Sequence, residues 1–290
     1  MREDIARLFD AMAESYDDLE PWYEHLYARL HAILRTTLAP ARGRPPGRAL
    51  DVGCGTGFQS AILGEIGYEV HGVDISPGLV KVARRRRPAR AWFSLASAED
   101  LPFPAAAFDV VNCCGSTLSF VERPERALAE IGRVLRPGGS LLLECEHKWS
   151  LDLAWAFLSS LTRDSLGYRT SLADLRRQLA RPLREGFWLD YAGDGAGSMR
   201  LRLFTLAELA TMLARAGIRP CRRWGLHSVT NAIPSTVLHR TGLGRGLGVV
   251  YRALRVLDVA VASLPPAVAL ANSVVILGQR QPLDSRDGDG

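Results

Sequence analysis

A glycine-rich turn at residues 48–58, with the sequence RALDVGCGTGF, contains the residues of this chain best suited to hold a ligand. Apolar residues before it predict a buried strand that enters the turn through Asp51. The glycines at 53, 55 and 57 have no Cβ, so a bound nucleoside can approach the backbone closely. A dinucleotide-binding G-x-G-x-x-G fingerprint would need glycine or alanine at position 58, and Phe58 excludes it.

An acidic residue, Asp74, ends the next predicted strand, Glu69–Val73, 17 residues beyond Gly57. A carboxylate at this place in an open α/β sheet can accept hydrogen bonds from both hydroxyls of a ribose. The helix expected at Phe58–Ile66 begins at the glycine-rich turn, and its N-terminus would favour an anionic group of the ligand. Turn, helix and carboxylate together predict a nucleoside site.

Strands and helices alternate as far as residues 108–111, and two late strands are expected within 219–227 and at 273–278. This alternation predicts an α/β fold with a parallel, doubly wound sheet. Ligands of such a sheet bind at the carboxyl ends of its strands. The predicted nucleoside site lies at that edge.

Four motifs occur in order: D-x-G-x-G-x-G at 51–57, the acidic strand end at Asp74, A-E-D-L-P-F at 98–103 followed by F-D-V-V at 108–111, and L-R-P-G-G at 135–139. Together they resemble the cofactor motifs of class I S-adenosylmethionine (SAM)-dependent methyltransferases. Residues 9–17 are similar to the N-terminal segment of the ubiquinone/menaquinone-type members, in which it closes over the methyl end of the cofactor. Aromatic residues that only pack a helix against the core are the alternative. The resemblance covers about 48–146, this N-terminal segment and the helix at 206–216.

The resemblance implies SAM as the cofactor, with no metal required. It also implies a Rossmann-like, doubly wound, seven-stranded and mostly parallel sheet whose last strand is antiparallel. The family commonly has aspartate where this chain has Ser97, so the contact with the adenine amino group is open among the Ser97 hydroxyl, Glu99 and the backbone. The expected cofactor-binding residues are Asp51, Gly53, Cys54, Gly55, Thr56, Gly57, Asp74, Ile75, Ser97, Ala98, Glu99 and Cys114.

Two stretches are longer than the minimal fold needs and predict helical cap insertions. The first contains helical stretches at 151–161 and 172–179 and a glycine-rich turn at 193–197. The chain is expected to divide into an N-terminal helical lid and linker at 1–47, a SAM-binding Rossmann-like core at 48–147 that continues at 205–228, caps at 148–204 and 229–271, the last strand at 272–280 and a disordered tail at 281–290.

The second insertion holds an apolar stretch, Leu247–Leu264, interrupted by Arg252, Arg255 and Asp258. Three charges in this length argue against a membrane-spanning helix. Burial within the cap or in a homodimer, or a peripheral position at a membrane interface, stay open as alternatives.

The composition is that of one large domain with insertions, because 290 residues with 47% hydrophobic side chains can bury a sizeable core. The net charge of +5 rests on arginine, since only Lys81 and Lys148 are lysines, and it permits anionic partners without requiring them. Five cysteines without a C-x-x-C pair predict reduced, buried thiols. The charged, amphipathic N-terminus does not resemble a signal peptide, so we expect a cytoplasmic protein.

We therefore expect a SAM-dependent methyltransferase that modifies an O or C atom of a small hydrophobic acceptor. The caps are rich in apolar and aromatic residues, which favours a quinone-like molecule, a polyketide or another specialised metabolite. A SAM-binding regulator or partner subunit without turnover is the alternative, because the motifs bind cofactor and do no chemistry. Nucleic-acid methylation would need an N-P-P-Y type motif where residues 112–115 read NCCG, so no nucleic-acid partner is expected.

A hydroxyl or phenol acceptor must lose a proton during transfer, and histidine is the usual base near neutrality. His147 follows the predicted fifth strand and His227 ends the sixth, both at the rim of the site. We predict His147 as the first candidate for the base and His227 as the second, with Glu146 or Tyr16 able to orient the base or the acceptor. A packing or substrate-positioning role stays open for both histidines.

Overall fold

The computed structural model describes residues 2–16, 27–40, 47–86, 90–192, 198–238 and 244–282. Two parts of the expected lid and linker, 17–26 and 41–46, lie outside these residues. So do the glycine-rich turn at 193–197 and the tail from 283, and the expectations for all of them stay untested. None of the helices in the described part of the chain is long and apolar enough to cross a membrane.

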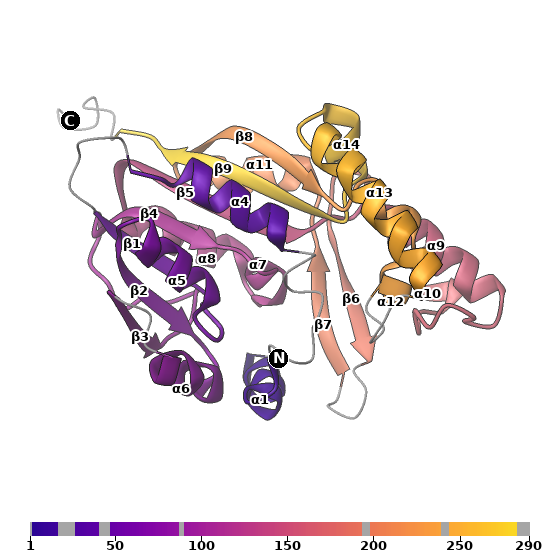
Figure 1. Cartoon of the computed structure of the whole chain (residues 1–290), viewed down its shortest axis with the longest axis horizontal. Coiled ribbons are helices and arrows are strands. Elements are labelled where there is room, and N and C mark those ends of the chain that lie inside the picture. Colours follow the sequence, from indigo (N-terminus) through magenta and orange to yellow (C-terminus); the bar gives the residue numbers. More distant parts are fainter. Residues whose placement is uncertain are drawn as a thin grey trace.

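A seven-stranded sheet with the order β3-β2-β1-β4-β5-β9-β8 forms the centre of the molecule (Figure 1). The neighbouring pairs from β3 to β5 are parallel, whereas β9 is antiparallel to both β5 and β8. This arrangement confirms the predicted fold class, including the antiparallel last strand. The strands are β1 Arg48–Val52, β2 Glu69–Asp74, β3 Ala91–Leu95, β4 Phe108–Cys113, β5 Leu135–Glu146, β8 Ile218–Leu226 and β9 Ser273–Arg280.

Helices cover both faces of the sheet because successive strand residues point to opposite sides. In β5, Leu141 packs with the cluster that includes α8 and α11, whereas Leu142 packs with the cluster that includes α4 and α5. Both leucines are fully buried. The flanking helices are α4 Ala28–Thr37, α5 Phe58–Glu65, α6 Pro77–Arg86, α8 Pro124–Val134 and α11 Leu206–Arg215.

The first insertion contains the two predicted helices, α9 Leu151–Leu161 and α10 Leu172–Leu179. It also contains an antiparallel hairpin of β6 Phe187–Ala192 and β7 Ser198–Leu203, which sequence analysis did not predict. The two strands pair only with each other among the strands that the structure describes.

The second insertion forms η1 Thr230–Ala232, α12 Ser235–Leu238, α13 Arg245–Val261 and α14 Pro265–Leu270. The two insertions meet, because the Trp155 indole Nε1 of α9 donates to the carbonyl oxygen of Asn231 at 2.9 Å. Ile233, Leu238 and Tyr251 form a separate small core between η1, α12 and α13. Segments far apart in the sequence therefore make one helical lobe beside the sheet, visible at the right of Figure 1.

Lys148 connects the end of β5 to this lobe. Its side chain is fully buried, and its ammonium donates to the carbonyl oxygens of Glu185 at 2.7 Å and Pro182 at 3.3 Å. The ammonium also lies 4.7 Å from the centre of the Trp149 ring. A buried cation needs such partners, so Lys148 holds the loop between α10 and β6 in place.

Lys148→Ala should lower the free energy of unfolding by about 2 to 3 kcal/mol, because two carbonyl groups lose a charged donor. Urea denaturation measures the loss, and trypsin should cleave the loosened loop faster after Arg184. Lys81 is the matched control, since it is exposed and its removal should leave stability within about 0.5 kcal/mol. Equal stability of the two variants would show that Lys148 does not hold the lobe.

Candidate cofactor-binding site

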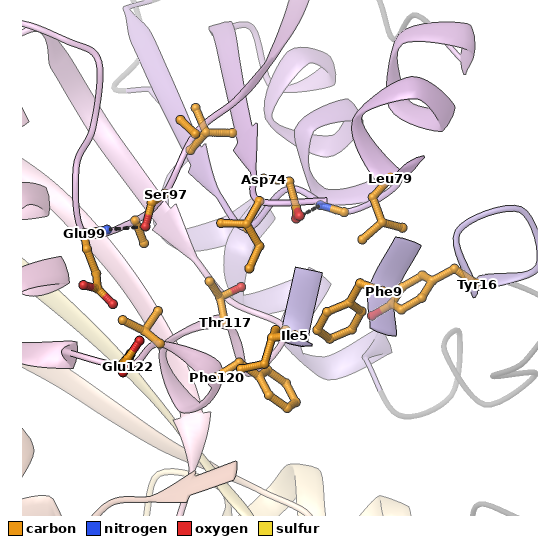
Figure 2. A pocket seen from close by; sticks show the side chains of 18 residues that line it. Ile5, Phe9, Tyr16, Asp74, Leu79, Ser97, Glu99, Thr117, Phe120 and Glu122 are labelled. Atoms are coloured by element: carbon orange, nitrogen blue, oxygen red, sulfur yellow. Dashed lines mark hydrogen bonds between the residues drawn. The ribbon is translucent and has the colours of Figure 1, made fainter. Parts of the chain in front are cut away.

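A cavity of about 730 Å³, counting its part open to solvent, lies at the carboxyl ends of β1, β2 and β4. Helix α1, Arg2–Met12, contributes to its wall. Figure 2 shows Ser97, Glu99 and Glu122 on one side of the cavity and Ile5, Phe9 and Tyr16 on the other. The volume and position are those of a ligand site in an open α/β sheet.

The glycine-rich turn forms one wall. The backbone N–H groups of Gly53 and Cys54 both donate to the carbonyl oxygen of Val73, at 2.8 and 3.0 Å, and fix the turn against β2. Gly53 has φ +71°, and a Cβ there would lie 2.2 Å from Thr117 Oγ1. Gly55 has φ +51°, and a Cβ there would meet no atom within 4 Å, so a ligand can lie directly against this glycine.

Asp51 lies beneath this turn, outside the residues that line the cavity. Its carboxylate accepts from Ser60 Oγ at 2.6 Å and Asn112 Nδ2 at 2.8 Å, which joins β1 to α5 and β4. Burial raises the pKa of Asp51 to about 6, although these hydrogen bonds act in the opposite direction. In this geometry the predicted cofactor-binding residue supports the turn from below.

Asp74 and Ile75, two of the expected cofactor-binding residues, line the cavity. The two carboxylate oxygens of Asp74 accept from the backbone N–H of Gly55 at 3.0 Å and of Ser76 at 2.9 Å. Burial raises the pKa of Asp74, and the two N–H donors oppose that rise. A carboxylate has about four acceptor positions, so it can also bind two ribose hydroxyls.

The loop after β3 brings Ser97, Ala98 and Glu99, which are also expected cofactor-binding residues, to the cavity. Ser97 Oγ accepts from the backbone N–H of Glu99 at 3.2 Å. The Glu99 carboxylate is 5% exposed and binds the Nε and backbone N–H of Arg123, at 2.8 and 3.1 Å. The Glu99 carboxylate, which lies beside the site, is therefore already ion-paired with Arg123.

The segment after β4 supplies Gly115 and, from the short helix α7 Thr117–Phe120, both end residues of that helix. The sequence analysis did not assign these residues to the site. Ser116 has φ +59°, and its N–H donates to the buried Glu144 carboxylate at 2.7 Å. Burial raises the pKa of Glu144. The glycine directly after a predicted strand was the one signal that could have identified this loop.

Helix α1 is attached by Asp10, whose carboxylate accepts from Ser76 Oγ at 3.1 Å and from the N–H of Gly78. This places a negative charge at the N-terminus of α6, where the helix dipole favours it. The Phe9 ring then packs edge-on against Phe120, with centroids 5.5 Å apart, and against Tyr16 at 6.1 Å. An apolar, aromatic wall results (Figure 2).

Six further predicted residues do not line this cavity: Cys54, Thr56, Gly57, Cys114, His147 and His227. His147 is only 2% exposed, its Nδ1 lies 3.3 Å from the Ala271 carbonyl oxygen, and burial lowers its pKa. Its side chain faces the segment before β9, which the position of a strand end could not reveal.

His227 and Cys114 also lie away from the cavity. His227 borders a separate cleft between α4, β8 and α13, with its Nδ1 3.0 Å from Thr230 Oγ1. Cys114 is 3% exposed, and its thiol points to the Leu142 carbonyl oxygen. The catalytic roles of His147 and His227 stay predictions, without a contact to the cofactor cavity in this geometry.

An α/β sheet with a glycine-lined cavity and an acidic end of β2 defines a nucleoside-binding protein. The sequence profile of the family described as "Methyltransferase domain" matches residues 50–143. Malonyl-[acyl-carrier protein] O-methyltransferase of Serratia marcescens is 35% identical over 63% of this chain and 71% of its own length. The chain therefore belongs to the class I SAM-dependent methyltransferases, which confirms the predicted family.

Demethylmenaquinone methyltransferase of Symbiobacterium thermophilum is 35% identical over 53% of this chain. The matched region spans 63% of that relative, somewhat less than two thirds of its length. A solved structure of 1,6-didemethyltoxoflavin-N1-methyltransferase from Burkholderia thailandensis, with bound S-adenosylhomocysteine, superposes with a TM-score of 0.53. It covers 97% of this chain and 90% of its own at 21% identity, so it supports the fold.

Asp74→Ala should weaken SAM binding by about 2 to 3 kcal/mol, because the ribose loses a charged acceptor. Calorimetric titration with SAM measures the change, and a melting curve checks that the turn still folds without the Gly55 bond. Asp100→Ala removes an exposed carboxylate from the neighbouring loop and should leave affinity unchanged. Unaltered affinity in the Asp74 variant, or tighter binding of NAD than of SAM, would contradict the cofactor assignment.

Proposed function

We propose that this protein transfers the methyl group of SAM to an O or C atom of a small, neutral, hydrophobic acceptor. The observation that carries the proposal is the wall of Phe9, Tyr16 and Phe120 facing the glycine-rich turn in one cavity. An apolar wall next to a nucleoside cradle suits an apolar reaction partner. The activated methyl on the sulfonium of SAM supplies the electrophile when the cofactor is bound.

Two relatives are named for different acceptors, a demethylmenaquinone and a malonyl group on an acyl-carrier protein. The described residues that line the cavity include no lysine, arginine or histidine. A malonyl carboxylate would lack a cationic partner there, whereas a quinone-like or polyketide ring needs none. The charge of the lining therefore favours the neutral acceptor.

The residues of the chain act by binding the cofactor and by enclosing the place where the methyl is transferred. Asp74 and the glycine-rich turn bind the nucleoside, while Phe9 and Phe120 exclude water from the place where the methyl moves. The Tyr16 side chain lies in the same cavity and is placed to orient a polar atom of the acceptor. We further propose that the caps at 148–204 and 229–271 cover the acceptor and that 1–47 acts as the lid.

Incubating the protein with methyl-labelled SAM and an organic extract of its own source tests transfer directly. Mass spectrometry should find a labelled, apolar product that disappears in the Asp74→Ala variant. A SAM-binding regulator or partner subunit is the second candidate, because the binding motifs do no chemistry. Tight SAM binding without any labelled product would favour that candidate.

The catalytic variants distinguish a base from a positioning role. A general base contributes about 10²- to 10⁴-fold to kcat. Because neither ring lines the cavity, His147→Ala and His227→Ala should keep kcat within about threefold, with a flat pH profile between about 6 and 9. Tyr16→Phe should lower kcat about tenfold with SAM affinity kept, through one lost hydrogen bond.

Steady-state kinetics at saturating SAM measures all three variants on the identified acceptor. A loss of about 100-fold or more in His147→Ala, with SAM affinity kept and a rate that falls below the histidine pKa, would establish His147 as the base.

A further inference from the structure

Helix α13 has an exposed apolar side. Its exposed fractions are 58% for Val249, 49% for Val250, 72% for Val256 and 55% for Leu257. Helical periodicity places these four residues on one side, which we call the α13 arc, while Tyr251 and Asp258 face the lobe and are buried. Leu264 continues the exposed apolar surface towards α14 at 52%. A contiguous surface of this kind marks an interaction site.

The exposed charges described on the segment 244–270, which carries the α13 arc, are of one sign. Asp258 is the acidic residue of this segment, and it is buried, with its carboxylate bound to the N–H of Val229 at 2.9 Å and to Thr230 Oγ1 at 2.8 Å. Among the described side chains of 244–270, the exposed charged groups are those of Arg252 and Arg255. The exposed charge described on this segment is therefore cationic.

A cleft beside the arc adds a third cation. Arg29 of α4 and Arg255 of α13 line it together with apolar residues, among them Ala32 and Leu226, and with the polar residues His227 and Asp258. The two Asp258 carboxylate oxygens already accept from the Val229 N–H and Thr230 Oγ1. The Nε of Arg29 is buried and has no hydrogen-bond partner among the described residues. Arg255 makes no ion pair with any other residue that the structure describes. Buried donors normally have acceptors. Because the Asp258 carboxylate of this cleft is already bound to Val229 and Thr230, an anionic oxygen supplied from outside would satisfy the Arg29 Nε.

We propose that the α13 arc docks on a membrane surface that contains anionic phospholipid, with lipid phosphate entering the cleft at Arg29 and Arg255. Amphipathic helices bind such surfaces by burying an apolar face while basic side chains meet the headgroups. A second copy of this face would bring arginine against arginine and offers no exposed carboxylate among the described side chains of 244–270. The inference rests on this surface and not on the proposed methyl transfer.

Flotation of the full chain with vesicles tests the proposal. We expect strong binding to phosphatidylcholine vesicles that contain about 30% phosphatidylglycerol, and weak binding to phosphatidylcholine alone. High salt should weaken the binding at least about tenfold, because screening removes the electrostatic part. Wild-type protein that stays unbound on both vesicles would overturn the proposal.

Matched variants separate the apolar and cationic contributions. Val256→Glu should weaken vesicle binding at least about tenfold. Leu183→Glu is its control, because Leu183 is also 72% exposed but precedes β6. Arg29→Ala with Arg255→Ala should lower binding to anionic vesicles about 10- to 30-fold. Arg215→Ala with Arg219→Ala removes equal charge near the opposite end of β8 and should have little effect.

Binding of S-adenosylhomocysteine should be the same in all these proteins, since none of the changed residues lines the cofactor cavity. An unchanged melting temperature checks that each variant is folded. Equal losses of vesicle binding in Leu183→Glu and Val256→Glu would show that the α13 arc is not a specific docking surface. A wild-type dimer in light scattering that Val256→Glu dissociates would make the arc an interface between copies. If inorganic phosphate binds at Arg29 and Arg255 but vesicles do not bind, the cleft is a site for a free anion and the membrane proposal is overturned.

Discussion

The cavity depends on three buried carboxylates that hold loops at the carboxyl edge of the sheet. Asp51 joins β1 to α5 and β4, Asp74 binds the N–H groups of Gly55 and Ser76, and Glu144 binds the N–H of Ser116. Burying a carboxylate costs free energy unless donors satisfy it. Each carboxylate therefore fixes definite loop atoms through its hydrogen bonds, and these bonds order the loops at the edge of the cavity.

That constraint explains why glycine is required where the loops meet. Gly53 faces the Thr117 side chain, and any Cβ would overlap it, so the turn after β1 and the loop after β4 can close together only with glycine at this position. Asp10 extends the same principle to α1, because its carboxylate accepts from the N-terminal turn of α6. Helix α1 forms part of the cavity wall but lies far in sequence from the cofactor motifs. Through Asp10 it is attached to the segment directly after β2, the strand that carries Asp74.

Local patterns predicted the glycine-rich turn, Asp74 and the 97–99 loop, because a strand, a turn and a polar residue at its end are encoded within a few residues. Phe9, Thr117 and Phe120 reach the cavity only because the chain folds them there. Their residue types and local sequence therefore did not identify them as site residues. The β6–β7 hairpin was missed because its strands pair with each other and not with the main sheet. His147 shows the same limit, since proximity to a strand end does not determine which way a side chain faces.

The most direct test of this account is a crystal structure of the protein with S-adenosylhomocysteine. We expect its ribose hydroxyls to bind Asp74, the ligand to lie against Gly55, and its sulfur to face the wall of Phe9 and Phe120. A nucleoside bound elsewhere, or one in this cavity with its ribose away from Asp74, would contradict it.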